Sequence, residues 1–308
     1  MIDRLVIIGV GLIGGSLARV LRRSDAVGEI VGVGRSAANL EAAVELGVVD
    51  RFEFDAAEAV KGADMVVVAV TLGASAAILE TIGPALDENT FVTDVGSTKL
   101  SVVASARAAL GARFPNFVPG HPIAGTERSG VKASFAELFE DHKVILTPVS
   151  ETREEALHAV VSLWRATGAS VVEMEAAHHD QVLAATSHLP HLLAYTLVDM
   201  LAAAKDSSEI FEFAAGGFRD FTRIASSNPE MWRDIILANR EAVLQMCEVY
   251  ADRFETLRRA IEAGDGAAIE VIFERAKLVR DRSVVSPHPS KRLAEHAVQP
   301  LKRGDGDQ

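Results

Sequence analysis

The fold of this chain is decided by the stretch Leu5-Val-Ile-Ile-Gly9-Val-Gly11-Leu-Ile-Gly14-Gly15-Ser16. Its first four residues are apolar and predict a buried parallel strand, and the leucine spacing after Gly15 predicts a helix. Between them the glycines have the spacing G-x-G-x-x-G. In that pattern Gly9 makes the tight turn, Gly11 lets the backbone approach a pyrophosphate, and Gly14 lets helix and strand pack closely. Because the first N–H groups of a helix bind phosphate, the stretch predicts a dinucleotide site rather than a purely structural turn.

The composition is that of a soluble globular protein with room for two domains. The chain has 308 residues, of which 49% are hydrophobic and 24% charged. Forty-three acidic against thirty-one basic side chains give a net charge of −12, which argues against a nucleic-acid or anionic-membrane surface. An anionic substrate would therefore need a local basic cluster. The single cysteine excludes an internal disulfide, and the sequence shows neither a leader nor an apolar run of membrane-spanning length, so we expect a cytoplasmic protein.

The second strand, over 29–34, bears on the choice of nucleotide. An NAD-binding unit usually carries an acidic residue at this point, to bind the ribose 2′-hydroxyl. This chain has Gly34-Arg35-Ser36 instead. Glycine leaves room for a 2′-phosphate that Arg35 and Ser36 could bind, which favours NADP. Arg35 can equally stack on the adenine, which NAD also permits, so the cofactor is NAD or NADP.

The rest of the cofactor domain is predicted as a doubly wound sheet. Its further strands are expected over 65–70, 91–94, 143–147 and 169–174, the last two extending the same sheet on either side of a helix over 152–167. Ligands bind beyond the carboxyl ends of such strands. We therefore expect cofactor contacts from the glycine turn and from the exit of the third strand, namely Gly9, Gly11, Leu12, Ile13, Gly14, Val70 and Thr71.

Two candidate catalytic residues follow at the same edge. Ser97 comes directly after the strand over 91–94, where it can contact substrate, cap the helix that starts near Lys99, or do both. His121 lies between a glycine and a proline in the segment 117–130, which has two prolines and three glycines in fourteen residues and is predicted as a loop. A histidine held rigidly beside the nicotinamide is suited to proton chemistry.

From about residue 175 the pattern becomes helical. We expect a cofactor domain over 1–173, a helical domain over 174–285 and a disordered tail over 286–308. Long helices are predicted over 231–263 and 266–283.

Pro190 interrupts a striped helical segment and should kink it, with His188 and His191 on one face around the kink. No third ligand accompanies these two histidines, so no metal site is predicted. Substrate binding and core packing both remain open for them.

A second cationic candidate lies in the segment 217–225. Arg219 and Arg223 are four residues apart among phenylalanines, which predicts partly buried guanidinium groups that face an anion. Asp220 could instead pair with one of them. Trp232 either lines the same wall or belongs to the core.

Five motifs in this order carry a family resemblance. They are Gly9-Val-Gly-Leu-Ile-Gly-Gly-Ser16, Asp94-Val-Gly-Ser-Thr-Lys99, Gly120-His-Pro-Ile-Ala-Gly-Thr-Glu127, Ser187-His-Leu-Pro-His191 and Gly217-Phe-Arg-Asp-Phe-Thr-Arg-Ile-Ala225. Over about residues 3–285 the chain resembles the prephenate/arogenate dehydrogenases of tyrosine biosynthesis, and it looks most like their bacterial cyclohexadienyl dehydrogenase branch. Members of that branch can use NAD without the acidic residue. The resemblance implies a Rossmann-type α/β domain followed by an all-α dimerisation domain, and hence a homodimer.

The resemblance also implies a reaction, the NAD(P)-dependent oxidative decarboxylation of prephenate to 4-hydroxyphenylpyruvate, with arogenate as a further substrate in that branch. By motif position His121 would accept the C4 hydroxyl proton, Ser97 would orient that hydroxyl, and Arg223 would hold a carboxylate. The supporting wall would be Arg219, His191 and Trp232, with Thr126 and Glu127 in a gating region.

Two other functions are compatible with parts of the pattern. Another dehydrogenase or an imine reductase would usually place a lysine or aspartate on the first long helix of the second domain, where this chain has His188 and His191. A nucleotide sensor or scaffold would need only the glycine turn, whereas this chain retains His121 and two arginines.

Overall fold

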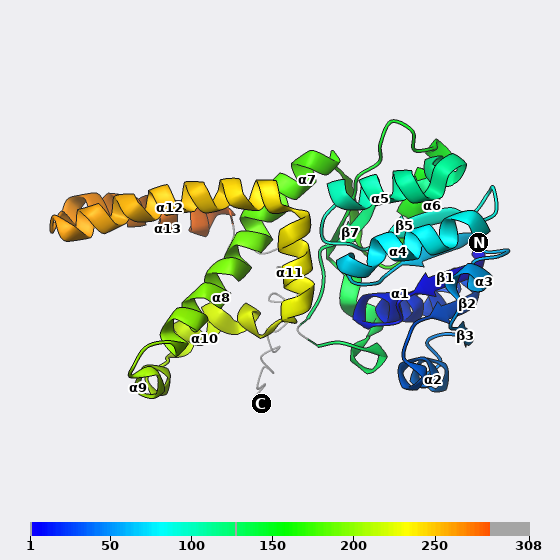
Figure 1. The fold of residues 1–308 in the computed structure, drawn as a ribbon, viewed down its shortest axis with the longest axis horizontal. Helices are drawn as coiled ribbons and strands as arrows, with labels where there is room; N and C mark the ends of the chain where they lie inside the picture. The colour runs from blue at the N-terminus through cyan, green and yellow to red at the C-terminus, as the bar shows by residue number, and fades with distance from the viewer. Residues whose placement is uncertain (1, 127, 284–308) are drawn as a thin grey trace, which may run out of the picture. The chain divides into compact units, whose positions relative to one another are not determined.

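The computed structural model describes residues 2–126 and 128–283 (Figure 1). Its contacts divide the chain into two compact units, Met1–Met246 and Cys247–Gln308. The tail expected over 286–308 and the candidate Glu127 lie outside the described residues. No helix in the described part of the chain is both long and apolar enough to cross a membrane.

The first unit is built on a six-stranded parallel sheet. The strands, in the spatial order β3-β2-β1-β4-β5-β6, are Arg51–Glu53, Val27–Val33, Ile2–Ile8, Met65–Val68, Phe91–Asp94 and Phe117–Val118. Helices α1 to α5 cover Leu12–Arg23, Ala37–Glu45, Ala56–Ala59, Leu72–Ile82 and Leu100–Leu110. This arrangement confirms the predicted Rossmann-type domain, with its buried strand, glycine turn and helix at the start of the chain.

Alternate residues of β1 pack on opposite faces of the sheet, as the two-residue period of a strand requires. Leu5 and Ile7 belong to one buried apolar cluster, which also holds Trp164 of α6 (Glu154–Arg165). Val6 and Ile8 belong to the other. The central strand is therefore buried on both faces, which explains its continuous apolar run.

A second, three-stranded sheet corrects the sequence prediction. Strand β7 (Gly120–Pro122) pairs antiparallel with β8 (Lys143–Leu146), and β8 pairs parallel with β9 (Ser170–Glu173). The expectation that these last two segments extend the main sheet is wrong, because β6 ends at Val118 and the chain leaves the main sheet there.

The loop predicted over 117–130 is also wrong in its first part, which forms β6 and β7. Both strands are short enough to tolerate the prolines. Pro119 lies between the strands and accepts a hydrogen bond from the Thr147 N–H at 2.9 Å through its carbonyl, and Pro122 ends β7. His121 consequently lies on a strand, paired with Ile145.

The helical part of the chain follows β9 and is confirmed as a helical domain. Its elements are α7 (Ala176–Leu183), a π-helical turn (Ala184–His188), α8 (Leu189–Ala202), α9 (Ser207–Glu212), α10 (Gly216–Thr222), a 3₁₀ turn (Arg223–Ser226), α11 (Pro229–Ala238), α12 (Arg240–Glu262) and α13 (Gly266–Ser283). The single helix predicted over 231–263 is in fact α11 and α12, interrupted at Asn239. The side chain of Asn239 is buried and hydrogen-bonded to Asp180 and His188.

Candidate active site

The glycine turn is shaped to hold a dinucleotide. Gly9 has φ +103°, and a Cβ there would lie 2.3 Å from the Ala69 carbonyl oxygen. A Cβ on Gly14 would lie 2.2 Å from the Gly9 oxygen, whereas one on Gly11 would meet nothing within 4 Å. Gly9 and Gly14 thus allow close packing of the backbone, and Gly11 leaves open space where its side chain would be. Helix α1 begins at Leu12 with no acidic residue in its first turn and no cap from any side chain that the structure describes, so its N–H groups are available to phosphate.

The other predicted cofactor contacts lie around this turn. Arg35 and Ser36 are exposed just after β2, and Ser36 caps α2 by accepting a hydrogen bond from the Asn39 N–H at 3.3 Å. Val70 is half-buried and Thr71 is exposed, between β4 and α4. Ser36 therefore also has a local structural role, as the N-cap residue of α2.

His121 begins a buried chain of hydrogen bonds that crosses into the helical domain. Its Nδ1 lies 2.9 Å from Nε2 of His179, and Nδ1 of His179 lies 2.8 Å from Oδ1 of Asp180. His179 is 0% exposed and Asp180 2%. The two residues come from α7, whereas His121 comes from β7.

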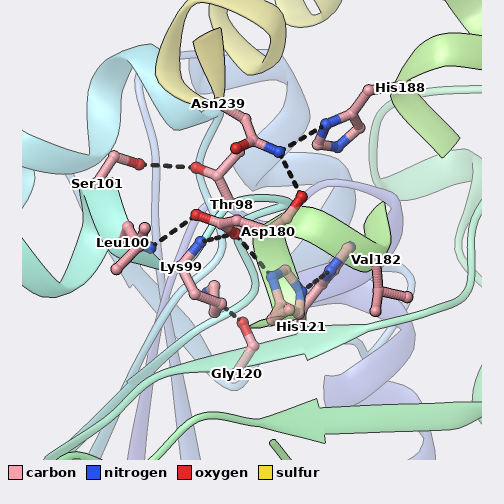
Figure 2. Close-up of polar contacts among 12 residues, drawn as sticks. Thr98, Lys99, Leu100, Ser101, Gly120, His121, Asp180, Val182, His188 and Asn239 are labelled. Atoms are coloured by element: carbon pink, nitrogen blue, oxygen red, sulfur yellow. Dashed lines mark hydrogen bonds and ion pairs between the residues drawn. The ribbon is translucent and has the colours of Figure 1, made fainter. Parts of the chain in front are cut away.

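Asp180 is anchored by the first backbone N–H groups of α5 (Figure 2). The Lys99 N–H donates to Oδ1 at 2.8 Å, and the Leu100 N–H donates to Oδ2 at 3.0 Å. Burial raises the pKa of Asp180, but the hydrogen bonds from His179 and from these N–H groups outweigh that effect and hold the pKa below its usual value. The carboxylate is therefore ionised and caps α5 from another part of the chain.

A buried ion pair fixes the start of the strand that carries His121. Lys99 is 0% exposed, and its Nζ lies 2.5 Å from Oδ2 of Asp94 and 2.6 Å from the Gly120 oxygen. The Gly120 N–H donates to the other oxygen of Asp94 at 3.1 Å. Burial lowers the pKa of Lys99, and the charge of Asp94 opposes that effect. Lys99 and Asp94 thus tie the end of β5 to the residue before His121.

His121 is suited to accept a proton. It is 9% exposed, and burial, followed by the neighbouring His179, Lys99 and His188, holds its pKa well below 6.5. The imidazole is therefore neutral at physiological pH, as a general base must be.

His188 has a defined tautomer. Burial lowers its pKa to about 4, so it is neutral at pH 7. The amide nitrogen of Asn239 donates to the Asp180 carbonyl at 2.7 Å and lies 3.1 Å from Nδ1 of His188. Because an amide nitrogen only donates, Nδ1 of His188 accepts, and the ring carries its proton on Nε2.

His191 has the opposite tautomer to His188. Its Nδ1 lies 2.8 Å from the Ser187 carbonyl oxygen, which only accepts, so the proton is on Nδ1 and the neutral ring keeps a lone pair on Nε2. The ring stacks on Trp232, with centroids 3.5 Å apart and planes at 22°. A π-helical turn, Ala184–His188, precedes α8, and Pro190 lies in the first turn of α8, where proline is tolerated.

The two arginines of the segment 217–225 are both exposed, so their predicted partial burial is wrong. The physical reason is that α10 is short and buries no residue completely. Arg219 lies on α10, and Arg223 begins the 3₁₀ turn that follows. Burial lowers the pKa of His191, the hydrogen bond to the Ser187 carbonyl opposes that effect, and the positive charge of Arg223 adds to the lowering.

The other candidates lie as follows. Ser97 is half-buried and does not cap α5, whose N-cap residue is Lys99. Its hydroxyl has no hydrogen-bond partner within residues 2–126 and 128–283. Thr126 is exposed and accepts a hydrogen bond from the Arg128 N–H at 3.2 Å.

Sequence reasoning missed the residues that hold His121 in place, which are Lys99 with Asp94, His179 with Asp180, and Asn239. A signal existed for the first pair, because an acidic residue that ends a buried strand five positions before a lysine needs a cation nearby. The adjacent His179 and Asp180 carried no comparable signal, since their contacts are with residues 58 to 81 positions away.

Comparison with known proteins gives a consistent result. Residues 17–173 match the family model for the prephenate dehydrogenase nucleotide-binding domain, and residues 175–275 match that for the prephenate dehydrogenase dimerization domain. A cyclohexadienyl dehydrogenase of Zymomonas mobilis is 38% identical over 90% of this chain and 94% of its own length.

Solved structures agree with this match. Prephenate dehydrogenase from Aquifex aeolicus, in complex with hydroxyphenyl propionate and NAD+, superposes with a TM-score of 0.85 at 36% identity, covering 91% of this chain and 98% of that one. Arogenate dehydrogenase from Synechocystis superposes with a TM-score of 0.77 at 29% identity, covering 91% of this chain and 100% of that one.

Proposed function

This chain belongs to the prephenate dehydrogenase family, and from that premise we propose that it catalyses the NAD(P)-dependent oxidative decarboxylation of prephenate to 4-hydroxyphenylpyruvate. The observation that carries the proposal is the buried, neutral imidazole of His121. It lies on β7, directly beyond β6, and the backbone of the preceding residue, Gly120, is tied to Asp94 and Lys99 at the end of β5. Substrates of a doubly wound domain bind at this edge.

The glycine turn and the open start of α1 would hold the pyrophosphate of the cofactor, with Arg35 near the adenosine end. When it is bound, the oxidised nicotinamide supplies the acceptor for a hydride from the ring carbon that carries the hydroxyl group. His121 takes the hydroxyl proton through Nε2 as that carbon becomes a carbonyl. Positioned proton transfer of this kind is typically worth about 10²–10⁴ in rate.

Loss of the ring carboxylate as CO2 then makes the ring aromatic. The electrons of the broken C–C bond move into the ring and onto the carbonyl oxygen, which recovers the proton from His121. Prephenate and NAD(P)+ thus give 4-hydroxyphenylpyruvate, CO2 and NAD(P)H, with no net release of a proton.

The remaining candidates bind the substrate in this proposal. The hydroxyl of Ser97, just after β5, has no hydrogen-bond partner among the described residues and would orient the reacting hydroxyl group. Arg223 would hold a carboxylate, and a hydrogen bond between charged groups contributes roughly 1.5–3 kcal/mol. The stacked His191 and Trp232 would form the wall, together with His188 and Arg219, and Thr126 would belong to the gating region that the family resemblance implies.

We also propose that the protein is a homodimer through its helical part. In the second compact unit, no side chain over residues 247–282 is fully buried. Large apolar side chains are exposed there, including Phe254 at 57%, Ile261 at 62%, Val271 at 60% and Phe273 at 56%. A helical hairpin with so much exposed apolar surface needs a partner, and the match to a dimerization domain supports a second copy of this chain.

An absorbance assay for reduced nicotinamide tests the function. It crosses prephenate and arogenate with NAD+ and NADP+, and so also measures both preferences. We expect turnover of prephenate by the native protein and a loss of at least about a hundredfold in His121→Asn with little change in prephenate binding. His142→Asn, at an exposed histidine, is the matched control. Near-native turnover by His121→Asn would remove the assigned role, and no turnover of either substrate by the native protein would overturn the proposal.

A further inference from the structure

The buried contacts around His121 fix more than its position. A neutral imidazole carries one proton, on Nδ1 or on Nε2, and only the nitrogen without it can accept another. In His121 Nδ1 faces the protein interior, 2.9 Å from His179. The nitrogen left for substrate is Nε2, and it can act as a base only if the ring proton is on Nδ1.

The chain of contacts determines where that proton lies. Asp180 is ionised and can only accept, so Nδ1 of His179, 2.8 Å away, must carry a proton. A neutral His179 then has a lone pair on Nε2. That lone pair accepts from Nδ1 of His121, and Nε2 of His121 is left unprotonated.

The carboxylate that starts this chain is itself held rigidly. Oδ1 of Asp180 accepts from both His179 and the Lys99 N–H, and Oδ2 accepts from the Leu100 N–H. The backbone carbonyl of Asp180 accepts from Asn239, which joins the start of α12 to the same point. Asp180 therefore cannot rotate away without leaving two N–H groups at the start of α5 unpaired.

We propose that His179 and Asp180 are positioning residues that set the tautomer of His121, so that Nε2 of His121 is free to accept the substrate hydroxyl proton. This inference rests on the proposed function for its kinetic consequence. The tautomer itself is a property of the protein without substrate, so it can be measured separately.

The first experiment reads the tautomer directly. Protein labelled with nitrogen-15 in histidine is studied by NMR at neutral pH, where protonated and unprotonated ring nitrogens have widely separated chemical shifts. The signals of His121 are assigned by their loss in His121→Asn. We expect a proton on Nδ1 of both His121 and His179. A proton on Nε2 of His121, or a doubly protonated His179, would overturn the proposal.

The second experiment compares two substitutions of His179. Methionine fills a similar volume but removes the acceptor, whereas the glutamine side chain can place its carbonyl oxygen near the position of Nε2. We expect His179→Met to lose roughly 10²-fold in kcat with KM for prephenate and NAD(P)+ unchanged, and His179→Gln to stay within about tenfold of the native enzyme. His142→Met is the control at an exposed histidine.

The outcomes separate positioning from a structural role. A native kcat in His179→Met, or an equal loss in both variants, would contradict the proposal. If His179→Met does not fold, as shown by its thermal unfolding, the NMR measurement on the native protein still decides. Absence of prephenate turnover in the native protein would overturn the proposed function but leave the tautomer result standing.

Discussion

Replacement of Lys99 by methionine should be the most destabilising single change at this site that preserves side-chain length. Lys99 is 0% exposed, with its ammonium 2.5 Å from Asp94 and 2.6 Å from the Gly120 oxygen. Removing one partner of a buried ion pair costs about 3–5 kcal/mol, because the other charge stays buried without compensation. Asp94 keeps hydrogen bonds from the N–H groups of Gly96 and Gly120, at 2.7 and 3.1 Å, so the lower value of about 3 kcal/mol applies.

Urea unfolding followed by circular dichroism measures this loss. With an m-value of about 3 kcal/mol per molar for a large chain, the midpoint should fall by about 1 M. Lys61→Met is the control, because Lys61 is exposed and its pairing with Glu58 contributes at most about 1 kcal/mol. The double variant Lys99→Met/Asp94→Asn should recover part of the loss, since it removes the carboxylate charge that Lys99 no longer compensates. A midpoint for Lys99→Met within about 0.3 M of the native value would refute the reasoning, because it corresponds to less than about 1 kcal/mol.

Four further predictions concern substrate binding, the pH dependence of activity and of stability, and assembly. Arg223→Ala should raise KM for prephenate roughly tenfold to a hundredfold with a smaller change in kcat, relative to the exposed control Arg165→Ala, and an unchanged KM would place the carboxylate elsewhere. Burial keeps the pKa of His121 well below 6.5, so kcat/KM should be constant from neutral pH down to 6.5. It should fall only at lower pH, where His121 becomes protonated and can no longer act as the base. A fall already complete at pH 6.5 would contradict the assignment of His121 as the base. Burial likewise lowers the pKa of His188 to about 4, so the unfolded chain binds this proton more tightly than the folded protein does. The stability that neutral His188 contributes should therefore be full above pH 6.5 and be lost as the pH falls towards 4. Thermal unfolding measured across this pH range checks the prediction. Phe254→Glu should shift the protein towards monomer in sedimentation velocity, whereas Phe54→Glu, at a phenylalanine of nearly equal exposure (58% against 57%), should not; two identical profiles would exclude Phe254 from the interface.

The sequence predicted the parts of the fold that depend on local pattern. The four apolar residues before Gly9, the glycine spacing and the leucines after Gly15 all act within one strand–turn–helix unit, and the structure has that unit as expected. The long helices of the second half were predictable for the same reason, because an apolar stripe is a property of neighbouring turns.

The errors arose where distant segments decide the outcome. Residues 143–146 and 170–173 read as buried strands, but no local feature says which sheet they join, and β8 pairs with β7 because β6 ends after two residues. The loop prediction for 117–122 failed for the same reason: glycine and proline disfavour a strand locally, and cross-strand pairing overrides that preference. Arg219 and Arg223 were expected to be partly buried from their phenylalanine neighbours, but a short helix on the surface exposes both faces of such a segment.

Helices α1 and α5 both begin at the edge of the sheet where the nucleotide and substrate are proposed to bind, but their N-termini differ in how they are capped. Helix α5 receives the ionised carboxylate of Asp180, which accepts from the N–H groups of Lys99 and Leu100 and offsets the positive end of the helix dipole. Helix α1 receives no cap from the side chains of residues 2–126 and 128–283 and has no acidic residue in its first turn. An anion that reaches this edge is therefore attracted to α1 and not to α5. The chain as a whole repels anions, since its net charge is −12. The uncapped start of α1 therefore binds the cofactor phosphates, and the start of α5, which Asp180 already occupies, does not compete for them. The same carboxylate that removes α5 as an anion site fixes the proton on His179, so two requirements of the proposed reaction depend on a single residue.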